Sequence, residues 1–457
     1  MSDVTMEKIV SLAKRRGFVF PSSEIYGGFS AIYDYGPLGA ELANNIKKVW
    51  WQAMVRENDN IVGLDSSIFM SPRIWEASGH VNGFSDPLTE CKKCHTRHRV
   101  DHMLEDIGVQ ADEKMSDDEI NTLLKKHAED LKCPSCGASD FSESHSFNLL
   151  VKSNLGDFTG KGDDPVYLRG ETCQGIYVNF KNVVDSMRVK IPFGIAQIGK
   201  AFRNEITARQ FIFRTREFEQ MEFQYFVHPD DEMKYFEEWK ARRMKYYLDL
   251  GVSEEKLRFH EHENLVFYAK AAFDIEYDFP FGWKELEGIH ARGNYDLTAH
   301  SEGCGKRLEY MDQVNNEKYI PHIVETAVGV GRTMLMVLAD SYHQEEVGDD
   351  TRVVLKIHPK LAPYTVAVLP LMKKAGMPEK AREVYKELAK NFSCDYDVTQ
   401  SIGKRYRRQD EIGTMFCITV DFEPLEDGQV TVRHRDTMEQ ERIAITHLQD
   451  YLSQHLA

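Results

Sequence analysis

The sequence predicts a multidomain protein that combines α+β and α/β architecture. A large domain built on an antiparallel sheet is interrupted by a small zinc-ribbon-like insertion and followed by a C-terminal α/β domain. Three observations support this fold class. The chain has 457 residues, enough for two or three domains. Strand-like runs separated by short turns fill the region from about 145 to 225. Beyond residue 360, strand and helix patterns alternate.

The expected boundaries follow changes in composition. Residues 1–87 and 141–350 form the large, discontinuous domain, residues 88–140 the insertion, and residues 360–457 the C-terminal domain. The insertion is polar, charged and rich in Cys and His, and Ser116 can cap a helix within it.

The elements of the large domain are expected in the following order. Residues 4–16 are helical, Pro37 opens a second helix, and a strand-like run ends at Pro72. Strands then cover 146–154 and 165–172, a hairpin covers 202–223, and helices cover 229–250 and 253–272. A strand at 320–328 runs through Gly329-Val330-Gly331-Arg332 into a helix.

The C-terminal domain is expected to hold a mainly parallel sheet, because strands alternate with helices. The expected strands are 364–371, 394–400, 415–422 and 429–436, and the expected helices are 378–392, 403–413 and 437–452.

Composition narrows the function classes. No apolar run is long enough to cross a membrane, and the start MSDVTMEKIV lacks the features of a signal peptide, so we expect a cytoplasmic protein. The formal charge of −16, from 57 basic and 73 acidic residues, argues against non-specific nucleic-acid coating and a DNA partner. A structured RNA on a local basic surface stays compatible with it.

Four of the eight cysteines form two C-x-x-C pairs: Cys91 with Cys94, and Cys133 with Cys136. Two such pairs can supply four thiolates to a tetrahedral ion, which predicts a structural Zn²⁺ site. The alternative is a set of reduced cysteines without metal. The other four, Cys173, Cys304, Cys394 and Cys417, are isolated, as expected of free thiols in a reducing compartment.

The stretch FRNEITARQFIFRTREFEQMEF carries the strongest chemical pattern. Its arginines can bind phosphate oxygens through two N–H groups at once, and Phe218 offers a face for a base. Downstream, the glycines of Gly329-Val330-Gly331-Arg332 allow close approach of a ligand, and Arg332 can reach a phosphate. The alternative is a charged surface hairpin with paired side chains.

These two stretches resemble motifs 2 and 3 of class II aminoacyl-tRNA synthetases, and the helix and strand ending at Pro72 resemble motif 1. The stretches YLRGETCQGIYVNF, YDLTAH, IPHIVETAVGVGR and SIGKRYRRQDEIGT further resemble the dimeric (α2) type of glycyl-tRNA synthetase over nearly the whole chain. This resemblance implies a homodimer that uses ATP, glycine and tRNA(Gly), with Mg²⁺ accompanying the ATP. It also implies activation of glycine as an adenylate, transfer to the tRNA 3′ end, and a diadenosine tetraphosphate side activity.

The resemblance implies a role for each matching residue. The catalytic arginines are Arg203, at the α-phosphate and the amino-acid carboxylate, and Arg332, at the far end of the triphosphate. The remaining ATP-binding positions are Glu205 near the adenine amino group, Arg214 at the phosphates, Phe218 stacked on adenine, and Glu325. Glycine is implied to meet Glu171, Glu222, Glu325 and Ala327. The candidate tRNA contacts of the C-terminal domain are Lys404, Arg405, Arg407, Arg408, Arg433 and Arg435; a solvated helix face is the alternative.

The chain departs from the usual family pattern at Gly170, Cys173, Thr326, Ala327 and Met415. Ala327 stands where a serine is expected, which removes a hydroxyl near the glycine Cα. Two other functions stay open at this point. One is a synthetase for another small amino acid, against which the three glutamates argue. The other is a retired paralogue that only binds RNA, against which the intact Arg203, Arg214 and Arg332 argue.

Overall fold

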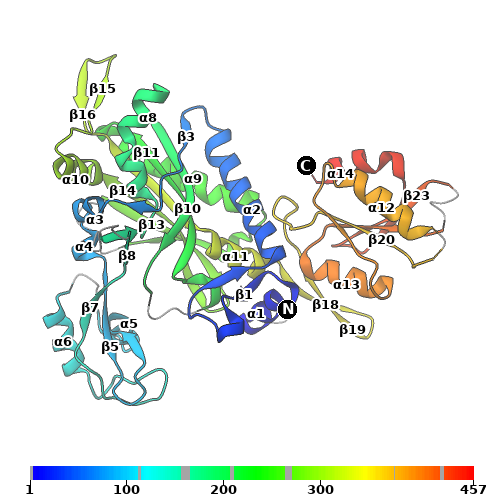
Figure 1. The fold of residues 1–457 in the computed structure, drawn as a ribbon, viewed down its shortest axis with the longest axis horizontal. Helices are drawn as coiled ribbons and strands as arrows, with labels where there is room; N and C mark the ends of the chain where they lie inside the picture. The colour runs from blue at the N-terminus through cyan, green and yellow to red at the C-terminus, as the bar shows by residue number, and fades with distance from the viewer. Residues whose placement is uncertain are drawn as a thin grey trace.

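The computed structural model describes residues 4–111, 115–155, 165–205, 210–262, 270–374, 376–422 and 427–456. Figure 1 shows a central sheet domain, from one side of which the inserted domain (cyan) projects, while the C-terminal domain (orange to red) lies at the other side. Within the described ranges, no helix combines the length and the apolar character needed to cross a bilayer.

The central domain is organised by a seven-stranded sheet in the order β12-β13-β14-β17-β11-β10-β3. Its strands are β3 (Ile61–Gly63), β10 (Phe193–Phe202), β11 (Glu217–Val227), β12 (Leu257–Glu261), β13 (Ala271–Phe279), β14 (Gly282–Gly293) and β17 (His322–Gly329). All neighbours are antiparallel except β3 and β10. The predicted antiparallel-sheet domain is therefore confirmed.

Helices pack on the central sheet and bury two hydrophobic clusters. The larger cluster is buried by α1 (Met6–Arg16), α2 (Pro37–Trp51), α9 (Glu232–Asp249) and α11 (Val330–Ser341). The smaller cluster is buried by α7 (Cys173–Val178), α8 (Phe180–Met187) and α10 (Tyr295–Cys304). Pro37 is the first residue of α2, as expected for a residue that lacks an N–H. A Cβ at Gly331 would lie 2.9 Å from the carbonyl oxygen of Ile212, so only glycine lets α11 start this close to the hairpin.

Short strands surround this core. They are β1 (Val19–Pro21) with β2 (Tyr33–Tyr35), β4 (Phe69–Met70) with β9 (Pro165–Leu168) and β8 (Val151–Asn154), and β15 (Tyr310–Asp312) with β16 (Glu317–Tyr319). The short helix α3 (Pro72–Ala77) follows β4 and leads to α4 (His80–Gly83) at the root of the insertion.

One predicted helix of this domain is wrong. The expected helix at 253–272 is instead the strand β12 and the start of β13, while residues 263–269 lie outside the described ranges. Leu257 pairs with Tyr277 and Phe259 with Ile275, so β12 forms the edge of the central sheet. The local pattern of this short amphipathic run predicts a helix. Pairing with β13 makes it a strand instead, and the local pattern does not reveal that pairing.

The inserted domain is a small sheet with two helices. Its strands β5 (Ser85–Glu90), β6 (Arg97–Arg99) and β7 (His145–Asn148) pair in the order β6-β5-β7. Its helices are α5 (Val100–Glu105) and α6 (Asp117–Lys126), and Ser116 and Glu119 form a capping box at the start of α6. The sheet reaches Ser85 and Asn148, so it extends beyond the expected limits 88 and 140.

The C-terminal domain has a five-stranded sheet in the order β21-β20-β22-β23-β24. Its elements are β20 (Val366–Pro370), α12 (Met377–Leu388), β21 (Cys394–Tyr396), α13 (Ile402–Ile412), β22 (Phe416–Val420), β23 (Gln429–His434), β24 (Gln440–Ala444) and α14 (Leu448–His455). The β21-β20-β22 part is parallel and the β22-β23-β24 part antiparallel, so the expectation of a mainly parallel sheet is only half right.

The expected helix at 437–452 is also partly wrong. Its first half is β24, which pairs with β23 through a tight turn at Met438, where φ is +60°. Only the second half is helical, as α14. A run as short as QERIA fits a strand or a helix, and the partner strand decides between them.

A hairpin of β18 (Tyr342–Val347) and β19 (Asp350–Leu355) links the central and C-terminal domains. From β19, the fully buried Arg352 donates 2.8 Å from Nε to Asp410 on α13, and its guanidinium also bonds the carbonyl oxygen of Arg435. Beside it, Arg15 and Arg16 of α1 pair with Glu411. The two domains are thus joined by buried and half-buried charges.

Candidate active site

The hairpin of β10 and β11 places the first phosphate-binding candidates. Ala201 lies opposite Phe218, so Arg203 follows directly at the end of β10. Its Nε donates 3.0 Å to the carbonyl oxygen of Gly170. Its guanidinium carbon lies 5.1 Å from the ring centre of Phe84 and 5.4 Å from that of Phe218. Two aromatic faces and a carbonyl therefore hold this arginine in one orientation.

Glu205 and Arg214 lie on the two sides of the hairpin link, part of which (206–209) is outside the described ranges. Arg214 Nε is 3.8 Å from Glu205 Oε1. The other carboxylate oxygen, Oε2, is buried and has no hydrogen-bond partner in the described part of the chain. An orphaned buried acceptor is costly unless a ligand donates to it, and the amino group of a base is such a donor.

Arg332 lies in the first turn of α11, directly after the end of β17, as the sequence predicts. Its Nη1 lies 2.9 Å from Glu285 Oε1, and its guanidinium carbon is 4.6 Å from the ring centre of Phe213. The charge and the hydrogen bond of Arg332 keep the pKa of the exposed Glu285 carboxyl below its usual value. Arg332 is thus already charge-paired and oriented for a further anionic ligand.

The structure brings together the three glutamates that sequence reasoning assigned to one pocket. Glu222 and Gln224 lie on the same face of β11, and Gln224 lies opposite Glu325 on β17. The Gln224 amide nitrogen donates 3.1 Å to Glu222 Oε1 and 2.7 Å to Glu325 Oε2. Cys173 bridges to the third carboxylate: its Sγ is 2.9 Å from Glu171 Oε1 and within 4.8 Å of carboxylate oxygens of Glu222 and Glu325.

Arg292 stabilises the negative charge of Glu325 more than that of Glu222. Its guanidinium donates to both oxygens of Glu325, at 3.1 and 3.0 Å, and 2.9 Å from Nε to Asp296. Burial opposes ionisation of Glu325, but Arg292 and a hydrogen bond from His290 lower its pKa to about 2. Burial and the charges of Glu325 and Glu171 raise the pKa of Glu222 to about 8. The pocket is therefore one cation short of letting Glu222 ionise at neutral pH.

Small residues lie beside these carboxylates. Ala327 is on the same face of β17 as Glu325, opposite Glu222 on β11 and opposite Gly288 on β14. A Cβ at Gly288 would come within 2.9 Å of the His290 ring. The strands therefore place their smallest side chains, Ala327 and Gly288, at the point where the carboxylates converge.

Sequence reasoning missed four groups of this pocket: Arg292, Gln224, Tyr177 and His80. Tyr177 donates 2.8 Å from its hydroxyl to Gln224, and His80 lies 3.0 Å from Glu171. Gln224 gave a signal, because it is a polar residue two positions after Glu222 in an apolar strand. Arg292 and His80 gave none, because their partners are far away in the sequence.

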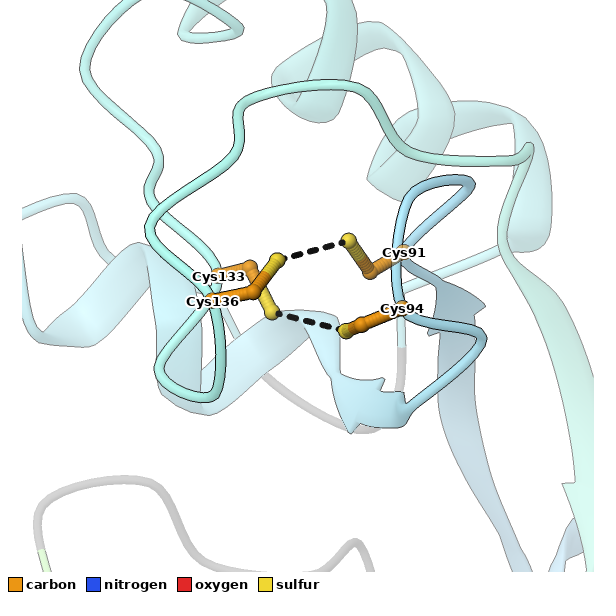
Figure 2. A group of neighbouring side chains, drawn as sticks. All are labelled: Cys91, Cys94, Cys133 and Cys136. Carbon is orange, nitrogen blue, oxygen red and sulfur yellow. Dashed lines mark hydrogen bonds between the residues drawn. The ribbon is translucent and has the colours of Figure 1, made fainter.

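The four paired cysteines converge in the inserted domain (Figure 2). The Sγ atoms of Cys91 and Cys136 are 3.6 Å apart, as are those of Cys94 and Cys133. All four lie within 4.8 Å of one another. Sulfurs at zinc–sulfur bond lengths of about 2.3 Å around one tetrahedral ion would lie at such separations. The donor set therefore fits a closed, structural zinc site.

Three of the candidate tRNA contacts require correction. Arg405, Arg433 and Arg435 are buried, with side chains that bind within the molecule. Arg405 donates to the carbonyl oxygens of Pro370 and Asp397, Arg433 pairs with Asp410, and Arg435 donates to the carbonyl oxygens of Ile357 and Gly413. These arginines stabilise the domain, because buried guanidinium groups need internal acceptors.

The other three candidates stay at or near the surface of α13. Lys404 is exposed, and Arg407 and Arg408 are half-buried. Arg408 pairs with Asp397, which leaves Lys404 as the most accessible cation of the three.

Comparison with known proteins identifies the family to which this chain is similar. Residues 157–341 match the tRNA synthetase class II core domain (G, H, P, S and T), and residues 365–455 match an anticodon binding domain. The chain is 54% identical over 453 residues to a glycine–tRNA ligase of Treponema denticola, covering 97% of this chain and 96% of the relative. It is 52% identical over 461 residues to a glycine–tRNA ligase of Geobacillus thermodenitrificans, covering 99% and 98%.

A solved prolyl-tRNA synthetase from Cryptosporidium parvum shares the fold. Its TM-score is 0.65 at 16% sequence identity, and the match covers 100% of this chain and 78% of that one.

Proposed function

The chain belongs to the glycine–tRNA ligases, within the class II aminoacyl-tRNA synthetases, and from this premise we propose how its residues divide the chemistry. In the first step the glycine carboxylate attacks the α-phosphorus of ATP, forming glycyl-adenylate and releasing pyrophosphate. In the second step the 3′-hydroxyl of the terminal tRNA ribose attacks the adenylate carbonyl, and AMP leaves.

The observation that carries this proposal is the charge deficit of the carboxylate pocket. Gln224 donates to both Glu222 and Glu325, while the Arg292 guanidinium donates to Glu325 and Asp296. A ligand ammonium supplies the missing positive charge and can donate to the carboxylates. An amino acid without a side chain suits the small residues Ala327 and Gly288 opposite each other.

The same pocket is proposed to exclude larger amino acids by contact. A methyl group on the ligand Cα would need space among closely packed strands, and protein interiors give way little. A pocket made for a large ligand selects only weakly against a smaller one. A pocket that is too small for the larger amino acids does not have that limit. The missing serine hydroxyl at Ala327 costs one polar contact but adds no bulk.

Three arginines are proposed to bind the nucleotide. Arg203, fixed by Gly170 and two rings, lies at the α-phosphate and the glycine carboxylate, while Arg214 and Arg332 take the far phosphates. Phe218 stacks on the adenine, and the orphaned oxygen of Glu205 accepts from the adenine amino group. ATP enters as its Mg²⁺ complex. Positioning and charge neutralisation then supply most of the catalysis, without a dedicated general base.

The remaining assignments rest on the family and on the inserted domain. Cys91, Cys94, Cys133 and Cys136 are proposed to hold a structural Zn²⁺, which would cross-link the insertion and fix its two loops. The C-terminal domain is proposed to contact tRNA(Gly) through Lys404 and its neighbours. A homodimer, a cytoplasmic location and a diadenosine tetraphosphate side activity complete the proposal.

Amino-acid-dependent exchange of pyrophosphate into ATP, measured with each of the twenty amino acids, tests the proposal. Glycine alone should support exchange. Exchange with alanine or serine in its place would keep the fold and mechanism but overturn the pocket assignment. Absence of exchange with every amino acid, with and without tRNA, would instead favour a retired paralogue that only binds RNA.

A further inference from the structure

His80 connects the root of the inserted domain to the proposed glycine site. It is the first residue of α4, and its Nε2 lies 3.0 Å from Glu171 Oε1. Because a carboxylate can only accept, Nε2 carries the proton of this bond. On the other side of the ring, Nδ1 lies 2.8 Å from the Ser78 hydroxyl. The imidazole is therefore bonded at both nitrogens.

Aromatic neighbours fix the plane of this ring. The ring centres of Trp75 and Phe84 each lie 5.2 Å from that of His80, both in edge-to-face geometry. Asn148, on the returning chain of the insertion, donates from Nδ2 to the carbonyl oxygens of His80 and Val81 at 3.1 and 2.9 Å. The backbone and the ring of His80 are therefore both fixed by residues where the inserted domain joins the central domain.

The bonds to Glu171 converge on one of its oxygens. His80 Nε2, Cys173 Sγ and Gln174 Nε2 lie 3.0, 2.9 and 2.8 Å from Oε1. Within the described residues, no hydrogen bond reaches Oε2. Burial alone would raise the pKa of Glu171, but the charge and the hydrogen bond of His80, followed by Arg292 and Cys173, hold it well below its usual value. Glu171 is therefore ionised, with one oxygen saturated and the other left for a ligand.

We propose that His80 is a positioning residue for glycine recognition: it holds Glu171 so that its second oxygen receives the ligand ammonium. The inference rests on the proposed function and deepens it, because it adds a residue from the insertion root to the amino-acid site. The same root segment supplies Phe84 to the guanidinium of Arg203, so the inserted domain borders both halves of the site.

Three substitutions separate the hydrogen bond from the packing. His80→Phe keeps an aromatic ring against Trp75 and Phe84 but removes the donor. His80→Gln keeps an amide nitrogen near the position of Nε2, whereas His80→Asn places its amide near Nδ1 and falls short of Glu171. Ser78→Ala removes the partner that orients the ring and leaves His80 in place. Glycine KM, ATP KM and kcat are measured for each by ATP–pyrophosphate exchange.

The expected result is specific to glycine. His80→Phe and His80→Asn should raise the glycine KM by about 10- to 100-fold, the loss expected for a hydrogen bond to a charged group, with ATP KM unchanged. His80→Gln should stay within about 3-fold of the unmodified chain, and Ser78→Ala should shift the same parameter by a smaller factor.

Two results would overturn the inference. An unchanged glycine KM in His80→Phe would show that Glu171 needs no such partner, and an equal loss in His80→Gln and His80→Phe would assign His80 to packing alone. If His80→Phe does not fold, Ser78→Ala and the Gln–Asn pair decide by the same criteria. Failure of the unmodified chain to exchange with glycine would overturn the proposed function, and the inference with it.

Discussion

Gln224 and Glu325 lie directly opposite each other on β11 and β17, and the amide nitrogen of Gln224 is 2.7 Å from Glu325 Oε2. Since the same amide also reaches Glu222, the distance between the two carboxylates is set by strand register. A shift of one residue would turn one of them to the other face of the sheet. The candidate site is therefore as rigid as the central sheet that carries it.

Replacement of Arg203 by alanine should remove activation and leave the fold intact. The guanidinium lies at the hairpin mouth between two rings, and few other contacts depend on it. We expect glycine-dependent exchange to fall by about 100-fold or more, as for other groups that stabilise transition-state charge. Arg203→Lys, which keeps the charge but loses the planar fork, should lie in between. Near-normal exchange in the alanine variant would take Arg203 out of the site.

The raised pKa of Glu222 predicts a pH-dependent stability. The Glu222 carboxyl keeps its proton up to a pKa of about 8 in the folded state, whereas in the unfolded state it loses the proton near its ordinary pKa of 4.5. The folded state therefore binds more protons between these values, and this group lowers stability as pH rises through that window. Glu222→Gln cannot titrate at this position. Its melting temperature should therefore fall less between pH 6 and pH 8 than that of the unmodified chain, with both measured at the same ionic strength.

The same substitution should weaken glycine binding. An amide cannot take up the negative charge that an ammonium stabilises, so glycine affinity should lose its rise with pH toward about 8. Calorimetric titration with glycine across this range checks it. A parallel pH profile in Glu222→Gln and the unmodified chain would contradict the assignment of the proton to Glu222.

A buried ion pair beneath the sheet predicts a large stability effect. Arg243 donates from Nε and Nη2 to Glu287 at 2.6 and 3.0 Å, and Tyr247 donates 2.6 Å to the same carboxylate. Both charged side chains are almost fully buried. Arg243→Met should cost about 3–5 kcal/mol in urea unfolding, because it strands a buried carboxylate. Arg243→Met with Glu287→Leu should recover much of this loss; an equal loss in both would argue against the pair as the cause.

Removal of one zinc ligand should abolish metal binding. Purified protein should carry about one zinc per chain, and Cys133→Ser should carry essentially none. Cys304→Ser is the matched control, because Cys304 is an exposed free thiol outside the cluster. Metal analysis of reduced, freshly purified protein distinguishes them. Zinc loss in the Cys304 variant, or none in the Cys133 variant, would remove the four-cysteine assignment.

The basic residues of α13 should separate into two groups. Lys404→Ala should raise the KM for tRNA several-fold, as for loss of one phosphate contact, and leave ATP–pyrophosphate exchange unchanged. Arg405→Ala should instead lower the stability of the C-terminal domain, because its guanidinium satisfies buried carbonyl oxygens. Aminoacylation kinetics and thermal unfolding of both variants test the division. A stable Arg405 variant with weakened tRNA binding would restore that residue as a contact.

Local signals in the sequence were sufficient for several features. Pro37 and Ser116 mark helix starts because each acts within one turn. The cysteine spacing predicted a cluster, since each C-x-x-C pair is bound to its own loop. The arginines of the hairpin followed from resemblance to family motifs.

Other features depended on distant partners. The local sequence of β12 and of β24 predicts a helix, but pairing with β13 and β23 decides that both are strands. The basic run around Arg405 predicts an RNA contact, yet two of the acceptors of Arg405 are backbone carbonyls 34 and 35 positions earlier in the chain. No sequence pattern marks His80 or Arg292, because the glutamate that each contacts is distant in the sequence.

The β18–β19 hairpin has a consequence for dividing this chain into fragments. A cut near residue 360, which the sequence favours as a domain boundary, would leave Arg352 on one piece and its buried partner Asp410 on the other. Each fragment would then expose an unpaired charge and part of the interface around Ile357 and Ile412. A C-terminal fragment intended for separate expression should therefore begin before Tyr342, so that it includes the whole β18–β19 hairpin.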